Sequence, residues 1–206
     1  MSMFYALVAL CLFGSAMAQI TKSGACPLVR VQQHFDSLKF CGRWFQWAGS
    51  FEVNSFPTEC EIFDYIPRSN HTIKLINTFN AISTGKREVL ETEITIPDHK
   101  ESAKMLTKIP ESPIEGYNNL WVLGTDYNNF AVVYSCTTTC SLNLQYGWIL
   151  TRKRIPDDSV VAKAYEIIEK NKLQSSYFLK TNQAGCSPNM ALFPGFPLGP
   201  WANSVW

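Results

Sequence analysis

Eight short runs of β-branched and aromatic residues, spaced at roughly ten-residue intervals, constrain the fold of this chain more than any other feature. Turn-forming segments such as Ser83-Thr84-Gly85-Lys86 and Pro110-Glu111-Ser112-Pro113 separate the runs. The expected strands cover residues 44–53, 61–67, 72–80, 89–95, 103–108, 120–125, 130–136 and 142–152. An all-β fold is therefore predicted, either an up-and-down barrel or a sandwich, and the spacing alone leaves both open.

A single helix is expected after the strands. Pro156 followed by Asp157-Asp158 is a typical helix start, because proline is pre-set for the first turn and acids suit the positive end of the helix dipole. Apolar residues then recur at helical spacing and give one stripe to pack against the sheet, at Val161, Ala164, Tyr165 and Ile168. Tyr177-Phe178-Leu179 is expected to form a short ninth strand.

The ends of the chain predict a secreted, extracellular protein. An apolar run followed by the small-residue cleavage site Ala16-Met17-Ala18 predicts a signal peptide over residues 1–18. Residues 19–187 then form one domain by length. Residues 188–206 hold Pro and aromatic residues without periodicity and are expected to be a flexible tail. Secretion makes Asn70, in the sequon Asn70-His71-Thr72, a candidate glycosylation site.

The formal net charge of +1 argues against nucleic acid as a partner. Arg152-Lys153-Arg154 is the one local basic cluster, and it coincides with a strand end. No metal site is expected, because no C-x-x-C motif occurs and His34, His71 and His99 are scattered without a paired spacing.

Six cysteines remain once Cys11 leaves with the signal peptide. An even number in a secreted chain predicts a disulfide framework, and six cysteines allow 15 connectivities. The six are Cys26, Cys41, Cys60, Cys136, Cys140 and Cys186. Sequence alone does not choose among these pairings.

Three distant segments predict how a β structure would be closed at one end. They are Gly42-Arg43-Trp44, Thr125-Asp126-Tyr127 and Arg152, and each lies beside an expected strand. Glycine lets one backbone pass close to another, because it has no Cβ. The flat face of Trp44 suits stacking by the Arg152 guanidinium, which is worth about 0.5–2 kcal/mol. Trp44 and Arg152 are therefore expected to plug one end of the sheet.

With their flanks, these segments resemble the motifs of the lipocalin family, most closely those of its apolipoprotein D and insect bilin-binding group. The matching runs are residues 40–45 (FCGRWF), 121–136 (WVLGTDYNNFAVVYSC) and 148–152 (WILTR). The resemblance covers about Cys26 to Cys186. It implies an eight-stranded antiparallel barrel closed at one end, one C-terminal helix packed outside, and a cup for a small hydrophobic ligand.

The resemblance also implies the disulfides Cys26–Cys136 and Cys60–Cys186. Cys41 and Cys140 depart from the family pattern and stay unassigned. Cys41 is expected near the closed end and Cys140 near the open end, too far apart for the Cα separation of about 7 Å that a bridge allows. The alternatives to that bridge are free thiols, or a bond from Cys140 to another subunit or protein.

The family pattern and strand alternation together predict the walls of the cup. Residues of one parity on three strands are expected to face the ligand: Trp148, Leu150, Tyr146, Tyr65, Phe63, Trp121 and Leu123. Taken alone, each of these aromatic residues is better explained as core, and the resemblance reverses this for Trp148, Tyr65 and Trp121 as a set. No interior Lys or Arg is evident in the expected strands, which favours a bilin, sterol, retinoid or carotenoid over a simple fatty acid.

A secreted carrier of such a ligand is the function that the resemblance implies, with no cofactor beyond the bound molecule. The chain is expected to be a monomer or weak dimer. One alternative is an assembly subunit similar to crustacyanin, in which the aromatic tail contacts a lipoprotein, a membrane or another lipocalin. A lipocalin-type isomerase is the other, but its nucleophile would be Cys60, which is assigned to a disulfide. Glu91 and Glu93 are interpreted as a solvated strand face, and no hydrolase or P-loop motif occurs, so no catalytic residue is expected.

Overall fold

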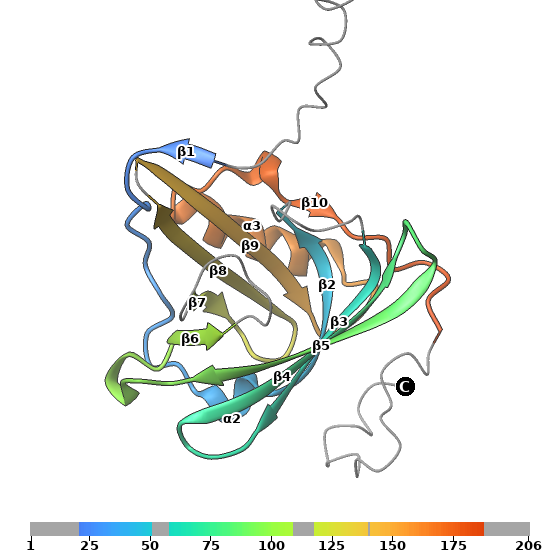
Figure 1. Ribbon diagram of the computed structural model, residues 1–206, viewed down its shortest axis with the longest axis horizontal. Helices are drawn as coiled ribbons and strands as arrows, with labels where there is room; N and C mark the ends of the chain where they lie inside the picture. The colour runs from blue at the N-terminus through green and yellow to red at the C-terminus, as the bar shows by residue number, and fades with distance from the viewer. Residues whose placement is uncertain (1–20, 51–57, 109–117, 140, 188–206) are drawn as a thin grey trace, which may run out of the picture.

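The computed structural model describes residues 21–50, 58–108, 118–139 and 141–187, and these form a closed antiparallel β-barrel with one main helix outside it (Figure 1). The barrel strands are β2 (Gly42–Gly49), β3 (Thr58–Pro67), β4 (Thr72–Ala81), β5 (Lys86–Thr95), β6 (Lys104–Lys108), β7 (Asn118–Thr125), β8 (Phe130–Thr139) and β9 (Leu142–Thr151). Each strand pairs with the next one along the chain, and β9 returns to pair with β2. That last pairing settles the choice between barrel and sandwich in favour of the barrel.

Two short strands extend the sheet where β2 and β9 meet. β1 (Thr21–Ser23) pairs with β9, and β10 (Leu179–Lys180) pairs with β2. The predicted ninth strand at 177–179 is wrong in its bounds, because Ser175–Tyr177 is a 3₁₀ turn. Backbone pairing begins only at Leu179, which lies opposite Gly49.

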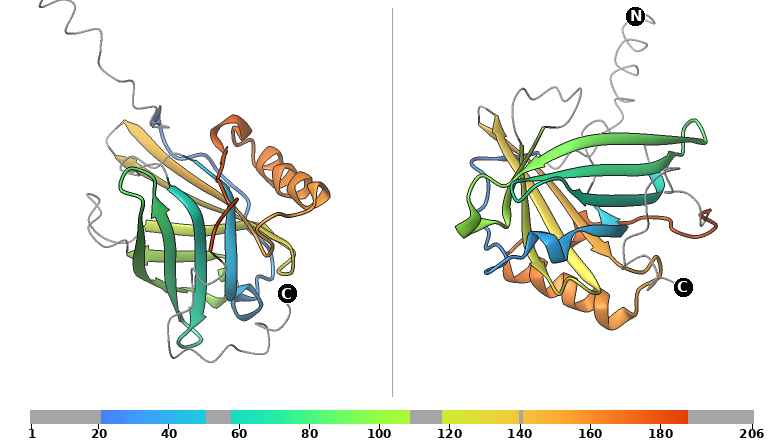
Figure 2. Two further views of the ribbon diagram at one scale, coloured as in Figure 1. Left: turned by 90° about the vertical axis from the view of Figure 1, so that its right-hand side faces the viewer. Right: turned by 90° about the horizontal axis from the view of Figure 1, so that it is seen from below.

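The helix α3 (Asp158–Lys170) begins where the sequence predicts and packs on the outer face of β7 and β8 (Figure 2). Ala164 and Ile168 of its apolar stripe are completely buried there. Gly124 of β7 allows the close approach, because a Cβ at this position would lie 2.9 Å from Cδ1 of Ile167. The barrel wall therefore has an apolar exterior beneath α3 as well as an apolar interior.

Arg152 closes one end of the barrel by binding the backbone of two other segments. Its guanidinium carbon lies 3.6 Å from the ring centroid of the fully buried Trp44. Its N–H groups donate at 2.7–3.2 Å to five backbone carbonyl oxygens, those of Lys39, Phe40, Cys41, Arg43 and Tyr127. Burial lowers the pKa of Arg152 to about 10, so the side chain stays charged at neutral pH.

The remaining residues of the closing motif shape the two segments that Arg152 holds. Gly42 has a φ of +103°, a conformation that L side chains rarely adopt. In the turn after β7, Asp126 accepts hydrogen bonds from the backbone N–H groups of Asn129 and Phe130, and Thr125 Oγ1 donates to the Phe130 carbonyl. The Tyr127 hydroxyl accepts from the N–H of Asp36, the N-cap of the short helix α2 (Ser37–Phe40). The three predicted segments thus meet at one floor.

Two disulfides tie the ends of the domain to the barrel. Cys26–Cys136 fixes the segment before α2 to β8, and Cys60–Cys186 fixes the segment after β10 to β3, with Cα separations of 5.9 and 5.5 Å. These are the two pairings that the resemblance implies. They span sequence separations of 110 and 126 residues. Closing loops of this length stabilises by about 3–5 kcal/mol each in the chain-entropy model.

Three of the sequence-based expectations fall on residues that the structure does not describe. They are the signal peptide at 1–18, the tail at 188–206 and Cys140. Within the described ranges, no helix is both long and apolar enough to cross a membrane.

Replacing Trp44 with alanine should lower the free energy of unfolding by about 3–5 kcal/mol, because a fully buried aromatic ring is lost and Arg152 keeps no stacking partner. Urea denaturation of the mature protein measures this loss. Trp148→Ala, at a half-buried position, is the matched control and should cost clearly less. If Trp44→Ala loses no more unfolding free energy than Trp148→Ala, Trp44 has no special role in stabilising the closed end.

Candidate ligand-binding site

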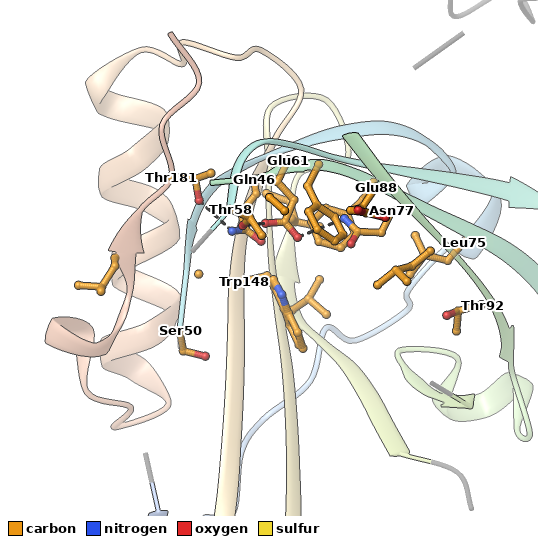
Figure 3. Close-up of a pocket in the computed structure, with 18 of the residues that line it drawn as sticks. Gln46, Ser50, Thr58, Glu61, Leu75, Asn77, Glu88, Thr92, Trp148 and Thr181 are labelled. Carbon is orange, nitrogen blue, oxygen red and sulfur yellow. Dashed lines mark hydrogen bonds between the residues drawn. The ribbon is translucent and has the colours of Figure 1, made fainter. Parts of the chain in front are cut away.

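A cavity of about 860 Å³ occupies the barrel between the floor and the opposite end (Figure 3). Its apolar wall is contributed by β3, β4, β5, β7, β8 and β9, with the residues Phe63, Tyr65, Leu75, Leu90, Leu120, Val133, Trp148 and Leu150. Tyr65 lies at its base, where its ring packs edge-on against Phe40 at 4.8 Å between centroids. Phe40 in turn packs on Trp44 at 5.5 Å, so the cavity rests on the floor that Arg152 closes. The volume is typical of small-molecule sites in proteins.

Four of the predicted wall residues line this cavity, namely Phe63, Tyr65, Trp148 and Leu150. A fifth, Tyr146, is not among the lining residues. Its ring stacks on Trp148 with 6.4 Å between centroids and an interplanar angle of 22°. Tyr146 thus supports the aromatic wall from a position two residues before Trp148 on β9.

The prediction that Trp121 and Leu123 face the cup is wrong. Both belong to the apolar cluster outside the barrel that includes Ala164 and Ile168 of α3. Their neighbours of opposite parity point inward, with Leu120 lining the cavity and Val122 in the interior core. Because α3 covers the outer face of β7, this strand is apolar on both faces, and alternation in the sequence does not reveal which face is inside.

Sequence reasoning missed a group of polar side chains on the cavity wall around Glu61. Glu61 is only 9% exposed. Its Oε2 accepts a hydrogen bond from Thr58 Oγ1 at 2.8 Å, and its Oε1 accepts one from Asn77 Nδ2 at 3.2 Å. A β-bulge between Glu59 and Ile62 places Thr58 and Glu61 on the same inner face, although they are three residues apart. The shared parity of Glu61 with Phe63 and Tyr65 was the available signal in the sequence.

The C-terminal segment completes the wall beside this group. Leu179, Lys180, Thr181 and Asn182 all line the cavity. Gln46 Nε2 donates to Thr181 Oγ1 at 2.8 Å. Gln183 Nε2 donates to the backbone carbonyls of Gln46 and Glu61 at 3.0 and 2.8 Å, which binds the segment to β2 and β3.

Cys41 is a free thiol at the end of α2, beside the floor. Burial raises the pKa of this thiol to about 11, a larger effect than the lowering by the nearby Arg152 charge. At neutral pH the group is therefore protonated and poorly nucleophilic. Cys140, the other unassigned cysteine, lies outside the described residues. Cys60, the nucleophile considered for an isomerase, is held in a disulfide.

The fold brings together two of the three histidines that the sequence leaves scattered. The rings of His71 and His99 lie 4.2 Å apart between centroids, and their Nε2 atoms are 3.2 Å apart. Among the described residues, no group of three His, Cys, Asp or Glu side chains is arranged to hold a metal ion. Asn70 of the sequon is exposed in the neighbouring turn between β3 and β4.

Comparison with known proteins identifies the family. The sequence model of the lipocalin / cytosolic fatty-acid binding protein family matches residues 41–185. The chain belongs to this family. Apolipoprotein D of Bos taurus is 32% identical over 187 residues, which cover 87% of this chain and 93% of that protein. Insecticyanin-A of Manduca sexta is 27% identical over 180 residues, covering 79% of this chain and 89% of the relative.

Solved structures show the same lipocalin fold. Lobster apocrustacyanin A1 superposes with a TM-score of 0.71 at 20% identity, covering 84% of this chain and 96% of the other. Insecticyanin from the tobacco hornworm gives a TM-score of 0.70 at 23% identity, covering 86% and 94%. Family membership and the apolar cavity together support binding of a small hydrophobic molecule by this lipocalin.

Alkylation of Cys41 by iodoacetamide at about pH 8 should be about 100-fold slower in the folded protein than at an ordinary thiol. Raising the pKa from 9.0 to about 11 lowers the fraction of reactive thiolate at this pH by that factor. Mass spectrometry of the peptide that contains residue 41 gives the rate. The same peptide in urea is the control and should react at the ordinary rate. Fast labelling of the folded protein would contradict the buried, protonated thiol.

Stability should depend on pH through Glu61. Burial raises its pKa above the ordinary value of 4.5, and the hydrogen bonds from Thr58, Asn77 and Gln46 offset this only in part. Above pH 4.5 the unfolded chain loses this proton while the folded protein keeps it until its own higher pKa is passed. Since the unfolded state then binds fewer protons, this contribution to the free energy of unfolding falls as the pH rises.

Glu61→Gln removes that contribution. The unfolding free energy of the variant minus that of the wild type should therefore increase from about pH 4 to about pH 8. Urea denaturation of both proteins at the two pH values measures the difference. A difference that stays constant or decreases over this range would show that Glu61 keeps an ordinary pKa.

Proposed function

We propose that this lipocalin is a secreted carrier that holds one small hydrophobic molecule in the barrel cavity. The observation that carries the proposal is a space of about 860 Å³ bounded by aromatic and aliphatic side chains. Proteins pack their cores at high density, so a void of this size is expected only where something is bound. Both disulfides and the Arg152 floor hold the walls in place before the ligand arrives, which reduces the cost of ordering on binding.

The expected affinity follows from the surface that the cup removes from water. A ligand that buries about 300 Å² of apolar surface gains roughly 7.5 kcal/mol from this term. The loss of translational freedom lowers that figure, and contacts with the aromatic wall add to it. Bilins, retinoids, sterols, carotenoids and fatty acids are the ligand classes considered, and flat conjugated molecules suit the wall of Phe63, Tyr65 and Trp148 best.

Secretion is supported by the signal-like sequence at 1–18 and by the two disulfides. Such bonds persist in oxidising compartments and are rare where thioredoxin and glutathione keep thiols reduced. The exposed position of Asn70 fits glycosylation in the secretory pathway. Assembly with a lipoprotein, a membrane or another lipocalin depends on the aromatic tail at 188–206 and stays a prediction.

Titration of the mature protein with retinol, progesterone and biliverdin tests the carrier function. At least one of them should quench the intrinsic fluorescence to saturation at one equivalent, with a dissociation constant of about 1 μM or tighter. Trp148→Phe is the matched variant, because it keeps an aromatic wall but removes the reporter that lines the cavity. It should bind the same ligand with a smaller quench. Failure of all three ligands to bind, or an unchanged quench in Trp148→Phe, would count against a ligand in the cup.

A further inference from the structure

We propose that Glu61 recognises a protonated amine, so that the cup takes a molecule with an apolar body and a cationic amino group. This inference rests on the proposed carrier function and specifies the ligand class of the same cavity. The carboxylate lies on the cavity wall among Gln46, Thr58 and Asn77, and Figure 3 shows these side chains gathered above the Trp148 ring.

The carboxylate of Glu61 has hydrogen-bonding capacity to spare. A carboxylate offers about four lone-pair sites. Thr58 and Asn77 each supply one neutral donor, one to each oxygen, at 2.8 and 3.2 Å, and the side chain of Gln46 supplies a third hydrogen bond. None of the ion pairs between described residues includes Glu61. Burial disfavours the ionised form of Glu61 in the empty cup, and a ligand that brings a cation would stabilise that form.

The cations near the cup are directed elsewhere. Lys180 is the one Lys or Arg among the described residues that line the cavity. Its Nζ lies 5.6 Å from the ring centroid of Trp47, which belongs to the exterior apolar cluster. Arg43, on the strand next to Glu61, donates to both carboxylate oxygens of Asp64 at 2.8 and 3.1 Å. With Glu88 also on the lining, the described wall presents acidic groups and no inward cation.

Gln46, which is hydrogen-bonded to Glu61, supplies a second acceptor. Its side-chain oxygen is buried and has no hydrogen-bond partner among the residues that the structure describes, and the residue, 7% exposed, lines the same cavity. Its Nε2 is occupied by Thr181. Buried polar atoms in native proteins nearly always have partners, so an unpaired acceptor at a ligand cavity points to a donor on the ligand. An ammonium carries three donors and no acceptor, which matches this wall.

A fatty acid would place its carboxylate against Glu61, where like charges repel. A neutral alcohol could exchange one hydrogen bond with Glu61 but would bring no charge to stabilise its ionised form. The net charge of +1 for the whole chain gives no general attraction for cations, so any preference for an amine must arise locally.

Three probes with one apolar body separate these cases: dodecylamine, dodecanol and dodecanoate. Their affinities for the mature wild-type protein are measured at about pH 7.4 by calorimetric titration, at concentrations where each probe is monomeric. Dodecylamine should bind at least about tenfold more tightly than dodecanoate, the ratio expected from one favourable charge contact. Glu61→Gln should weaken dodecylamine at least about tenfold and leave dodecanol within about threefold. Glu88→Gln, at an exposed lining position, is the matched control and should retain the amine preference.

The outcomes distinguish this proposal from the carrier function itself. Binding of dodecanol and dodecanoate without preference for the amine would overturn the role of Glu61 and leave the carrier function standing. Equal weakening of all three probes by Glu61→Gln would show that the residue only supports the wall. If none of the probes, nor retinol, progesterone or biliverdin, binds the wild type, both proposals fail. The preference of the wild type decides the matter even if the variant does not fold.

Discussion

The contact on which this barrel depends most is the one between the Arg152 guanidinium and the backbone of its closed end. One side chain satisfies five carbonyl oxygens from two segments and stacks on Trp44 at the same time. Carbonyl groups buried without partners are costly, so these hydrogen bonds stabilise the two segments in their positions. Arg152 directly follows β9, and it thereby fixes the segment that enters β2 from α2. This contact supports the pairing of β9 with β2 that closes the sheet into a ring. Everything above this floor, the cavity included, depends on that closure.

Most of the fold could be predicted from the sequence because its determinants are local or belong to one motif. Strand runs, turn residues and the start of α3 are short-range features, and Gly42, Trp44 and Arg152 are residue types that few other positions require. The lipocalin resemblance supplied the choice of barrel over sandwich, which depends on a pairing between strands at opposite ends of the chain. Spacing in the sequence carries no information about that pairing.

The candidate site could be predicted only in part, and the two failures have different physical causes. Trp121 was placed inside from strand alternation and the family pattern, but α3 gives β7 an apolar outer face as well. Glu61 was overlooked because an acidic residue in a strand is usually exposed. Its burial depends on a β-bulge and on donors from β3 and β4, and those come together only when the barrel is formed.

The segment from Leu179 to Cys186 adds a consequence for biosynthesis. It lines the cup, bonds through Gln183 to the strands that carry Gln46 and Glu61, and is locked to β3 by a disulfide. The last barrel strand ends at Thr151, but the wall of the cup is complete only when the segment after α3 is in place and Cys186 has formed its disulfide with Cys60. For the proposed secreted carrier, the cup would therefore be complete only after the Cys60–Cys186 bond has formed in an oxidising compartment.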